Sequence, residues 1–552
     1  MDKMRIVVIG GVAAGTSAAA KARRNDENAE IVIYDRDKDI SYAGCGLPYY
    51  IGGIIKDRKK LVPRDSKFFK ERYNIDVFTS HSVLDIRPDV KKLIVQNDVT
   101  GERFEDKYDK LLIATGARPI MPPIQGIDKP NVFPLRSVAH ADAINEFIEK
   151  NQPERAVIVG GGFIGLEMAE NLVHRGIAVG LADMAQQVMT PMDEDMAIYV
   201  QKHLEQNGVK LHLGHAVQAL LGSDYVTHVQ LADNISIETD MVIMAIGIKP
   251  NVELAKKINI KLGPTGAIAV DSRMQTSIPD VYAAGDCAEA YSVINGKPLY
   301  RPLGSTANKM GRIAGDQMTG GDLEFRGILG TSIFKTFDLT VAQTGLSEKE
   351  AKAQGYDVVV CHNIKYDHAE YYPDSKEMII KAVADKATHR VLGAQIVGPR
   401  GVDKRIDVFA TAITFGAKAE DLFHLDLAYA PPFSTAKDPV IYTGMILEGI
   451  LNRNRPLMTP HQLIQRQLGG ELITIIDTRE PEAYKNGHIE GAVNIPLANL
   501  RSQAKRLDKN IPVVTYCNRG VTGNAAQNVL LQMGFKEVYN LSGGYFNYMA
   551  IK

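Results

Sequence analysis

Cysteine is scarce in this sequence, and its scarcity excludes one class of folds. The chain has 552 residues and only four cysteines, which are scattered along it: Cys45, Cys287, Cys361 and Cys517. Four are too few for the disulfide framework of a small secreted protein, and they fit a reducing compartment. No His or Cys spacing predicts a metal site, since the Cys361-His362 pair has no second pair.

An excess of charge and a long apolar run are also missing. Lys plus Arg number 64 and Asp plus Glu 65, so the net charge is −1 and gives no general field for nucleic acid or a membrane surface. No run of about 18 apolar residues predicts a membrane span. The apolar start, residues 6–20, is broken by glycines and lacks a convincing signal-peptide cleavage site. We therefore predict a cytoplasmic protein of three to four globular domains.

Two segments of the chain resemble each other. Residues 5–24 read RIVVIGGVAAGTSAAAKARR, and residues 156–176 read AVIVGGGFIGLEMAENLVHRG. Each is a β-branched run, a glycine turn and a helical pattern, which is how a βαβ unit opens. A second apolar run then ends in an acid, Asp35 or Asp183. The first glycine and the acid are 25 residues apart (10 to 35) and 23 apart (160 to 183), close to the spacing of about 20 in dinucleotide folds.

Glycines in such turns let the backbone approach a pyrophosphate, and the acid accepts from ribose hydroxyls. The second unit has all three glycines, Gly160, Gly162 and Gly165, whereas the first has Gly10 and Gly15 with Val12 between them. No arginine follows Asp183 to receive a 2′-phosphate, which favours NADH over NADPH without excluding NADPH.

Later segments divide the chain further. Residues 111–119 (LLIATGARP) and 241–251 (MVIMAIGIKPN) are similar strand-to-turn pieces, and residues 276–290 close on Gly285-Asp286. We predict an FAD-binding domain in residues 1–118 and 251–325, an NAD-binding domain in 119–250 and a dimerisation domain in 326–451. A linker, 452–460, and a small α/β domain, 461–552, complete the prediction.

The segment around Cys45 carries a family resemblance. Residues 41–53 (SYAGCGLPYYIGG) resemble the active-site segment of the coenzyme A-disulfide reductase group of flavoprotein disulfide reductases, and the likeness extends to about residue 450. The residue five positions after Cys45 is Tyr50, so a C-x4-C pair is absent and a single thiol must cycle as a mixed disulfide, persulfide or sulfenic acid. To react at neutral pH it must be a thiolate, which nearby positive charge or a helix N-terminus favours.

The resemblance implies further site residues. Tyr371 and Tyr429 match two tyrosines that reach the thiol across a homodimer and could protonate a leaving thiolate, with Tyr372 a neighbouring alternative. Two larger sets match ligand contacts. The coenzyme A channel would be lined by Lys21, Arg24, Ser41 and Arg72. FAD would be held by Gly10, Gly15, Asp35, Val83, Thr115, Gly116, Asp286 and Lys437.

The last domain resembles a rhodanese sulfurtransferase over its whole length. The resemblance rests on Asp477 and Arg479, on the piece from Gly487 to Ala492, and on Cys517 after an apolar run. A loop of backbone N–H groups leading into a helix would stabilise Cys517 as a thiolate or persulfide. Many rhodaneses carry a second basic residue near the end of this loop. Thr522 stands there instead, which puts thiosulfate in doubt as the preferred donor.

These expectations converge on one fold and three functional alternatives. The fold class is α/β: two Rossmann-like domains as in glutathione reductase, an α+β dimerisation domain and an α/β rhodanese domain. The leading hypothesis is a homodimeric FAD enzyme that uses NADH to reduce coenzyme A disulfide, coenzyme A persulfide or polysulfide at Cys45, with sulfane sulfur passing between Cys45 and Cys517. The alternatives are an NADH oxidase or peroxidase that cycles through a cysteine sulfenic acid, and a flavin-based redox sensor. Cys287 and Cys361 are expected to be packing residues, Cys287 near the flavin.

Overall fold

The computed structural model describes residues 3–552. They form two compact units. Of the described residues, the first unit comprises 3–188 and Gly208–Gly330, and the second comprises Met189–Asn207 and Thr331–Lys552. Within the described residues no helix is long and apolar enough to cross a membrane.

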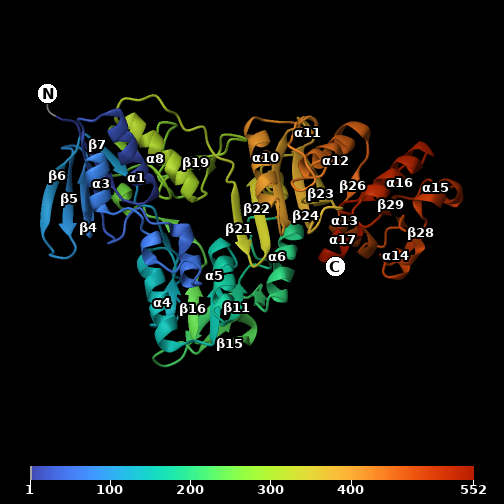
Figure 1. The fold of residues 1–552 in the computed structure, drawn as a ribbon, viewed down its shortest axis with the longest axis horizontal. Coiled ribbons are helices and arrows are strands. Elements are labelled where there is room, and N and C mark those ends of the chain that lie inside the picture. Colours follow the sequence, from blue (N-terminus) through green and yellow to red (C-terminus); the bar gives the residue numbers. More distant parts are fainter. Residues whose placement is uncertain (1–2) are drawn as a thin grey trace. The chain divides into compact units, whose positions relative to one another are not determined.

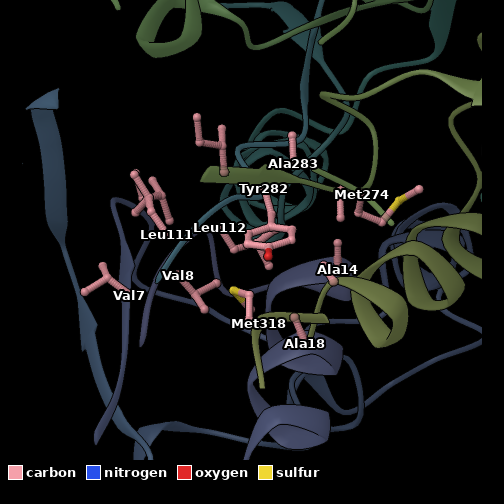
Figure 2. Close-up of a cluster of buried hydrophobic side chains, with 14 of the residues drawn as sticks. Val7, Val8, Ala14, Ala18, Leu111, Leu112, Met274, Tyr282, Ala283 and Met318 are labelled. Atoms are coloured by element: carbon pink, nitrogen blue, oxygen red, sulfur yellow. The ribbon is translucent and has the colours of Figure 1, made fainter. Parts of the chain in front are cut away.

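The first unit begins with a parallel sheet in the order β18-β7-β1-β2-β3. Its strands are β1 (Arg5–Ile9), β2 (Glu30–Asp35), β3 (Asp76–Thr79), β7 (Lys110–Ile113) and β18 (Val281–Ala283). Helices α1 (Ala13–Asn25) and α8 (Gly304–Met318) pack on each other beside it. Figure 2 shows side chains of β1, β7 and β18 and of both helices in one apolar cluster. The helices approach so closely that a Cβ on Gly311 would lie 2.2 Å from the Ala14 carbonyl oxygen, and glycine at this position makes the approach possible.

A second parallel sheet in this unit repeats the arrangement, in the order β12-β11-β10-β16-β9. Its strands are β9 (Val132–Pro134), β10 (Arg155–Val159), β11 (Ala178–Asp183), β12 (Lys210–Leu213) and β16 (Met241–Met244). Its helices are α4 (Val138–Asn151) and α5 (Phe163–His174). Both sheets therefore carry the strand, turn and helix predicted from the paired glycine motifs.

Short elements complete the first unit. Two antiparallel three-stranded sheets consist of β4 (His81–Arg87), β5 (Lys92–Asn97) and β6 (Arg103–Lys107), and of β13 (Val217–Leu221), β14 (His228–Leu231) and β15 (Ser236–Glu238). Two strand pairs are β8 (Ala117–Pro119) with β17 (Ile248–Pro250), and β19 (Ala290–Tyr291) with β20 (Pro298–Leu299). The remaining helices are α2 (Leu47–Ile51), α3 (Ser66–Tyr73) and α7 (Glu253–Lys257), with 3₁₀ turns η1 (Gly44–Gly46), η2 (Arg58–Lys60) and η3 (Ala232–Asn234).

The second unit starts with an antiparallel sheet in the order β21-β22-β25-β24-β23. Its strands are β21 (Ser332–Thr336), β22 (Leu339–Gly345), β23 (Val358–Tyr366), β24 (Glu377–Asp385) and β25 (Val391–Gly398). Its helices are α6 (Glu194–Gln206), α9 (Glu348–Ala353), α10 (Val402–Thr414), α11 (Ala419–Phe423) and α12 (Pro439–Arg453). Strand β24 lies between β25 and β23, and all but its first residue are buried.

A parallel sheet in the order β26-β30-β29-β27-β28 completes this unit (Figure 1). Its strands are β26 (Leu457–Met458), β27 (Thr474–Asp477), β28 (Ala492–Asn494), β29 (Val513–Tyr516) and β30 (Val538–Leu541). Its helices are α13 (Pro460–Leu468), α14 (Pro481–Lys485), α15 (Leu497–Gln503), α16 (Val521–Gln532) and α17 (Gly544–Ile551), with the 3₁₀ turn η4 (Ala504–Arg506). Strand β26 falls inside the segment expected to be a linker and pairs with β30.

Candidate active site

The first glycine turn is shaped by close backbone contacts. A Cβ on Gly10 would lie 2.2 Å from the Ala114 carbonyl oxygen, and one on Gly15 would lie 1.8 Å from the Gly10 oxygen. Only glycine fits at either position, so β1 and α1 meet as closely as a pyrophosphate site requires. Asp35 closes the turn by accepting from the backbone N–H of Gly11 at 2.6 Å. Burial raises the pKa of this carboxyl group to about 6, although backbone donors oppose the shift.

A cavity of about 920 Å³ runs along this turn. The predicted FAD contacts that line it are Gly10, Asp35, Val83, Thr115, Gly116 and Asp286. Gly15 does not line the cavity but allows the close contact of β1 and α1 that shapes the turn. Asp286 forms an ion pair with Arg136. A long cavity with a glycine cradle and a ribose-accepting acid fits a dinucleotide such as FAD. Lys437 belongs to the second unit, so its flavin contact stays a prediction.

The second glycine turn repeats this construction at β10 and α5. A Cβ on Gly160 would lie 2.4 Å from the Ala245 oxygen, and one on Gly165 would lie 1.9 Å from the Gly160 oxygen. Around Gly162, by contrast, no atom would come within 4 Å of a Cβ. Glycine at this position is therefore not explained by protein packing, and it leaves space for a ligand against the helix N-terminus. Asp183 accepts from the N–H groups of Gly161 at 2.7 Å and Ala185 at 2.8 Å.

Cys45 is exposed and lies in η1, directly before α2. That nearby positive charge or a helix N-terminus favours its thiolate stays a prediction, since the protein groups around the thiol do not lower its pKa. Although the residue is exposed, partial burial of the thiol is the largest influence and raises its pKa. Glu167 and Asp286 raise it further, and only Arg136 opposes them. Arg136 is itself paired with Asp286, so the positive charge that it offers to the Cys45 thiol is partly neutralised.

A second cavity, of about 510 Å³, lies beside the first turn. Two of the predicted coenzyme A contacts, Arg24 and Ser41, line it, together with Arg64 and Arg312, which the sequence analysis missed. Arg64 and Arg312 are 248 positions apart (312 minus 64), so no local pattern could have paired them.

The other two predicted contacts do not line this cavity. Lys21 forms an ion pair with Asp316 at 2.9 Å. Arg72 lies over the rings of Phe68 and Tyr73, 5.7 Å from each centroid. Their contact with a ligand stays a prediction.

Tyr371 and Tyr429 lie together although 58 residues separate them in the chain. Their hydroxyl oxygens are 3.5 Å apart, and the side chains are 77% and 50% exposed. The hydrogen bond between them raises the pKa of Tyr371. Tyr372 instead packs its ring against His368. The pairing supports Tyr371 as the partner of Tyr429, while their contact with a thiol of a second copy stays a prediction.

Cys517 follows β29 and is 7% exposed. Its carbonyl oxygen accepts a hydrogen bond from the N–H of Tyr545 at 2.8 Å, so α17 anchors the start of the loop. Arg479 binds Asp477 at 2.6 Å and the carbonyl oxygen of Gly487 at 2.7 Å. The separate pieces of the predicted rhodanese motif are thereby joined around one loop.

The other two cysteines are packed inside. Cys287 and Cys361 are both 0% exposed, and burial raises the pKa of each thiol. Cys287 donates to the carbonyl oxygens of Ile113 and Ala284, and it follows the cavity residue Asp286. Within residues 3–552, no group of three or more His, Cys, Asp or Glu side chains could hold a metal ion.

Comparison with known families identifies the chain. The family model of pyridine nucleotide-disulphide oxidoreductases matches residues 4–310, and the dimerisation-domain model of the same family matches residues 331–439. The chain belongs to this family. A rhodanese-like domain model matches residues 459–551, so this pyridine nucleotide-disulphide oxidoreductase carries a rhodanese domain at its C-terminal end.

Three relatives show how far the likeness extends. The crystal structure of reduced Bacillus anthracis CoADR-RHD is 40% identical, covers 100% of this chain and 98% of its own, and has a TM-score of 0.97. An NAD-dependent persulfide reductase from A. fulgidus is 38% identical over 99% of this chain and 100% of its own, with a TM-score of 0.92. The NAD(P)H sulfur oxidoreductase (CoA-dependent) of Pyrococcus furiosus is 40% identical over 81% of this chain and 100% of its own.

These findings confirm the predicted family, fold class and enzyme class. The protein is a flavoprotein reductase, and FAD and NAD(P)H are the cofactors that its family implies. The exact domain boundaries and the roles of individual site residues stay predictions.

Proposed function

We propose that the enzyme uses NADH to reduce coenzyme A disulfide, coenzyme A persulfide or polysulfide at Cys45, and that Cys517 exchanges sulfane sulfur with these compounds. The observation that carries the proposal is a lone exposed thiol, Cys45, in the same unit as an arginine-lined cavity. Arginines suit the phosphates of coenzyme A, because their planar forks bind phosphate oxygens in pairs. The names of the relatives, which include CoA-dependent and persulfide-reducing enzymes, point to the same substrates.

The first chemical step belongs to Cys45. Its thiolate attacks one sulfur of a coenzyme A disulfide, forms a mixed disulfide and releases one coenzyme A thiolate. Bound FAD supplies the reducing equivalents, two electrons from NADH, that cleave the mixed disulfide and return Cys45 to the thiolate. Overall, one disulfide, one NADH and one proton give two thiols and NAD⁺. Burial, together with Glu167 and Asp286, raises the pKa of the Cys45 thiol, so positive charge or hydrogen-bond donors on the bound ligands would favour the thiolate.

Other residues bind and orient. In the first turn, Asp35 accepts from ribose hydroxyls while Gly10 and Gly15 admit the pyrophosphate. In the second turn, Asp183 does the same for NADH, with Gly162 leaving the space that the nucleotide fills. The absence of an arginine next to Asp183 supports NADH over NADPH.

We also propose a homodimer, in which Tyr371 and Tyr429 of one copy donate a proton to the thiolate that leaves at Cys45 of the other. The match to a dimerisation domain and the exposure of both tyrosines support this arrangement. Sedimentation of the full-length protein tests it: a dimer is expected, and a stable monomer that keeps full reductase activity would refute it. The four free cysteines support a reducing compartment such as the cytoplasm.

A substrate panel tests the reductase function. NADH consumption is measured with coenzyme A disulfide, coenzyme A persulfide, polysulfide and oxygen for the wild type, Cys45→Ala and Cys517→Ala, with Cys361→Ala as a matched control. Cys45→Ala should abolish turnover of every sulfur substrate, and the control should keep it. Turnover of oxygen that exceeds turnover of all sulfur substrates would favour an NADH oxidase instead.

The same panel tests the role of Cys517. Cys517→Ala should slow turnover of persulfide and polysulfide while leaving coenzyme A disulfide reduction unchanged. If Cys517→Ala leaves every substrate unchanged, the proposed sulfur exchange is wrong.

A further inference from the structure

The loop that begins at Cys517 contains one basic residue, and that residue is already bound. Between Cys517 and Thr522 only Arg519 is cationic. It forms an ion pair with Glu377 of β24, and its Nη2 donates to the Tyr366 hydroxyl of β23 at 2.8 Å. Glu377 therefore neutralises much of the charge that Arg519 could offer to an anion at Cys517. Thr522 adds no charge, and its hydroxyl lies 3.1 Å from that of Thr478.

A second cation lies next to this loop on the neighbouring domain of the same unit. Lys365 precedes Tyr366 in β23, and its Nζ lies 3.6 Å from the centroid of the Tyr442 ring. Burial lowers the pKa of Lys365 to about 8, and repulsion from Arg519 and Lys437 adds to that shift, whereas Cys517 opposes it. None of the groups that shift its pKa is a carboxylate. Lys365 thus stays largely protonated at neutral pH, and Cys517 is among the groups that act on its charge.

Tyr442 connects Lys365 to the loop. Burial raises the pKa of Tyr442, and Cys517 raises it further, so this ring also lies within electrostatic range of the thiol. A cavity of about 480 Å³ is lined by Tyr442 of α12 and by Arg519, Gly520 and Val521 of the loop. Helix α12 and the Cys517 loop therefore face one space that is large enough for a small sulfur anion.

We propose that Lys365 is the second cation of the Cys517 site: the dimerisation domain supplies the positive charge that the loop lacks at Thr522, and Lys365 selects anionic sulfane-sulfur donors. This inference rests on the sulfurtransferase part of the proposed function and names a residue that positions its substrate. Lys365 acts on two charges. It stabilises the Cys517 thiolate before transfer, and it holds the negative end of the donor or of the persulfide afterwards.

Thiosulfate shows how the charges balance. The Cys517 thiolate attacks the sulfane sulfur of S₂O₃²⁻, a new S–S bond forms, and the old S–S bond breaks with its electron pair leaving on SO₃²⁻. Cys517 then carries a persulfide anion. Cyanide attacks the terminal sulfur of this persulfide, takes it as SCN⁻ and regenerates the thiolate. The total charge is −3 on each side of the first step and −2 on each side of the second, so each encounter brings together anions that a nearby cation stabilises.

The experiment compares the wild type with Lys365→Met and Lys365→Arg in the full-length flavin-loaded protein. The matched control is Lys386→Met, which removes an exposed lysine of the same domain. The first measurement is the rate at which iodoacetamide labels Cys517 as a function of pH, read from the mass of the peptide that contains it. A nearby positive charge favours a thiolate over a thiol, so Lys365→Met should shift this profile upward by about one unit. Lys365→Arg should restore the wild-type profile, and Lys386→Met should leave it in place.

The second measurement is thiocyanate formation from thiosulfate and cyanide. Lys365→Met should raise the KM for thiosulfate about tenfold, in step with the alkylation shift, and Lys365→Arg should return it to within about threefold of the wild type. An unchanged alkylation profile and KM in Lys365→Met would overturn the role of Lys365. A wild-type protein that transfers no sulfur would instead refute the proposed sulfurtransferase function. The alkylation profile does not depend on sulfur transfer, so it tests the role of Lys365 even in that case.

Discussion

Lys381 offers the sharpest test of what holds the second unit together. Its side chain is 1% exposed, in the middle of β24, and it neutralises three carboxylates from two other segments, the start of α6 and α9. Its Nζ lies 2.8 Å from Asp195, 2.7 Å from Glu348 and 3.3 Å from Asp193. Replacing it in Lys381→Met would leave those buried charges without their shared cation.

The expected loss follows from the partners that remain. Removing one member of a buried ion pair destabilises a protein by about 3–5 kcal/mol. His362 still binds Asp195 at 2.9 Å, and Gln395 still donates to Asp193 at 2.6 Å, so the lower limit applies. About 3 kcal/mol corresponds to roughly a 150-fold larger opening equilibrium.

Amide hydrogen exchange of peptides from β23 and β24, measured by mass spectrometry, detects such an opening directly. Lys386→Met is the control, because Lys386 is 64% exposed and its pairing distance to Asp357 is 3.7 Å. An exposed pair contributes less than about 1 kcal/mol, so exchange in the control should change by no more than roughly fivefold. Exchange in Lys381→Met within a factor of two of the wild type would refute the reasoning.

Three further predictions concern the flavin site, the thiols and acid stability. Gly15→Ala should lose bound flavin, seen as lower visible absorbance per protein, because the new Cβ would lie 1.8 Å from the Gly10 oxygen; Gly304→Ala, which meets no atom within 4 Å, should keep it. Iodoacetamide should label exposed Cys45 long before Cys361, whose pKa burial raises to about 12, and equal labelling rates would contradict the assignment. Burial alone would raise the pKa of Asp195, but His362 and Lys381 outweigh it and lower that pKa. The stability that ionised Asp195 gives the folded state is therefore complete above the ordinary aspartate pKa of about 3.9, and it is lost as pH falls below that value. Thermal unfolding of Asp195→Asn should accordingly change less on acidification than that of the wild type, and equal acid sensitivity would contradict this.

The sequence allowed prediction wherever the chemistry depends on residues close together in the chain. In each dinucleotide unit the first glycine and the acid lie no more than 25 residues apart, so the spacing alone predicted both units. The pieces around Cys517 were likewise recognisable, and Arg479 joins them in the structure.

Long-range neighbours could not be predicted. Glu167 and Arg136 act electrostatically on Cys45 only because distant segments of the first unit fold together, so the direction of its pKa shift had no local signal. Arg64 and Arg312 reach the same cavity from distant segments. Lys365 lies in a strand whose pattern indicates only burial, and its relation to Cys517 depends on how the dimerisation and rhodanese domains pack.

The hydrogen bonds of Asp183 have a consequence for changing the nucleotide that the enzyme accepts. Each carboxylate oxygen of Asp183 already accepts from a backbone N–H, one from Gly161 and one from Ala185. The side chain that would read the ribose is thus also a brace for the glycine turn. A redesign for NADPH that simply removes this acid would loosen the turn that receives the pyrophosphate. Asp183 thus couples nucleotide preference to the rigidity of the turn, and a variant with changed preference needs another acceptor for the N–H groups of Gly161 and Ala185.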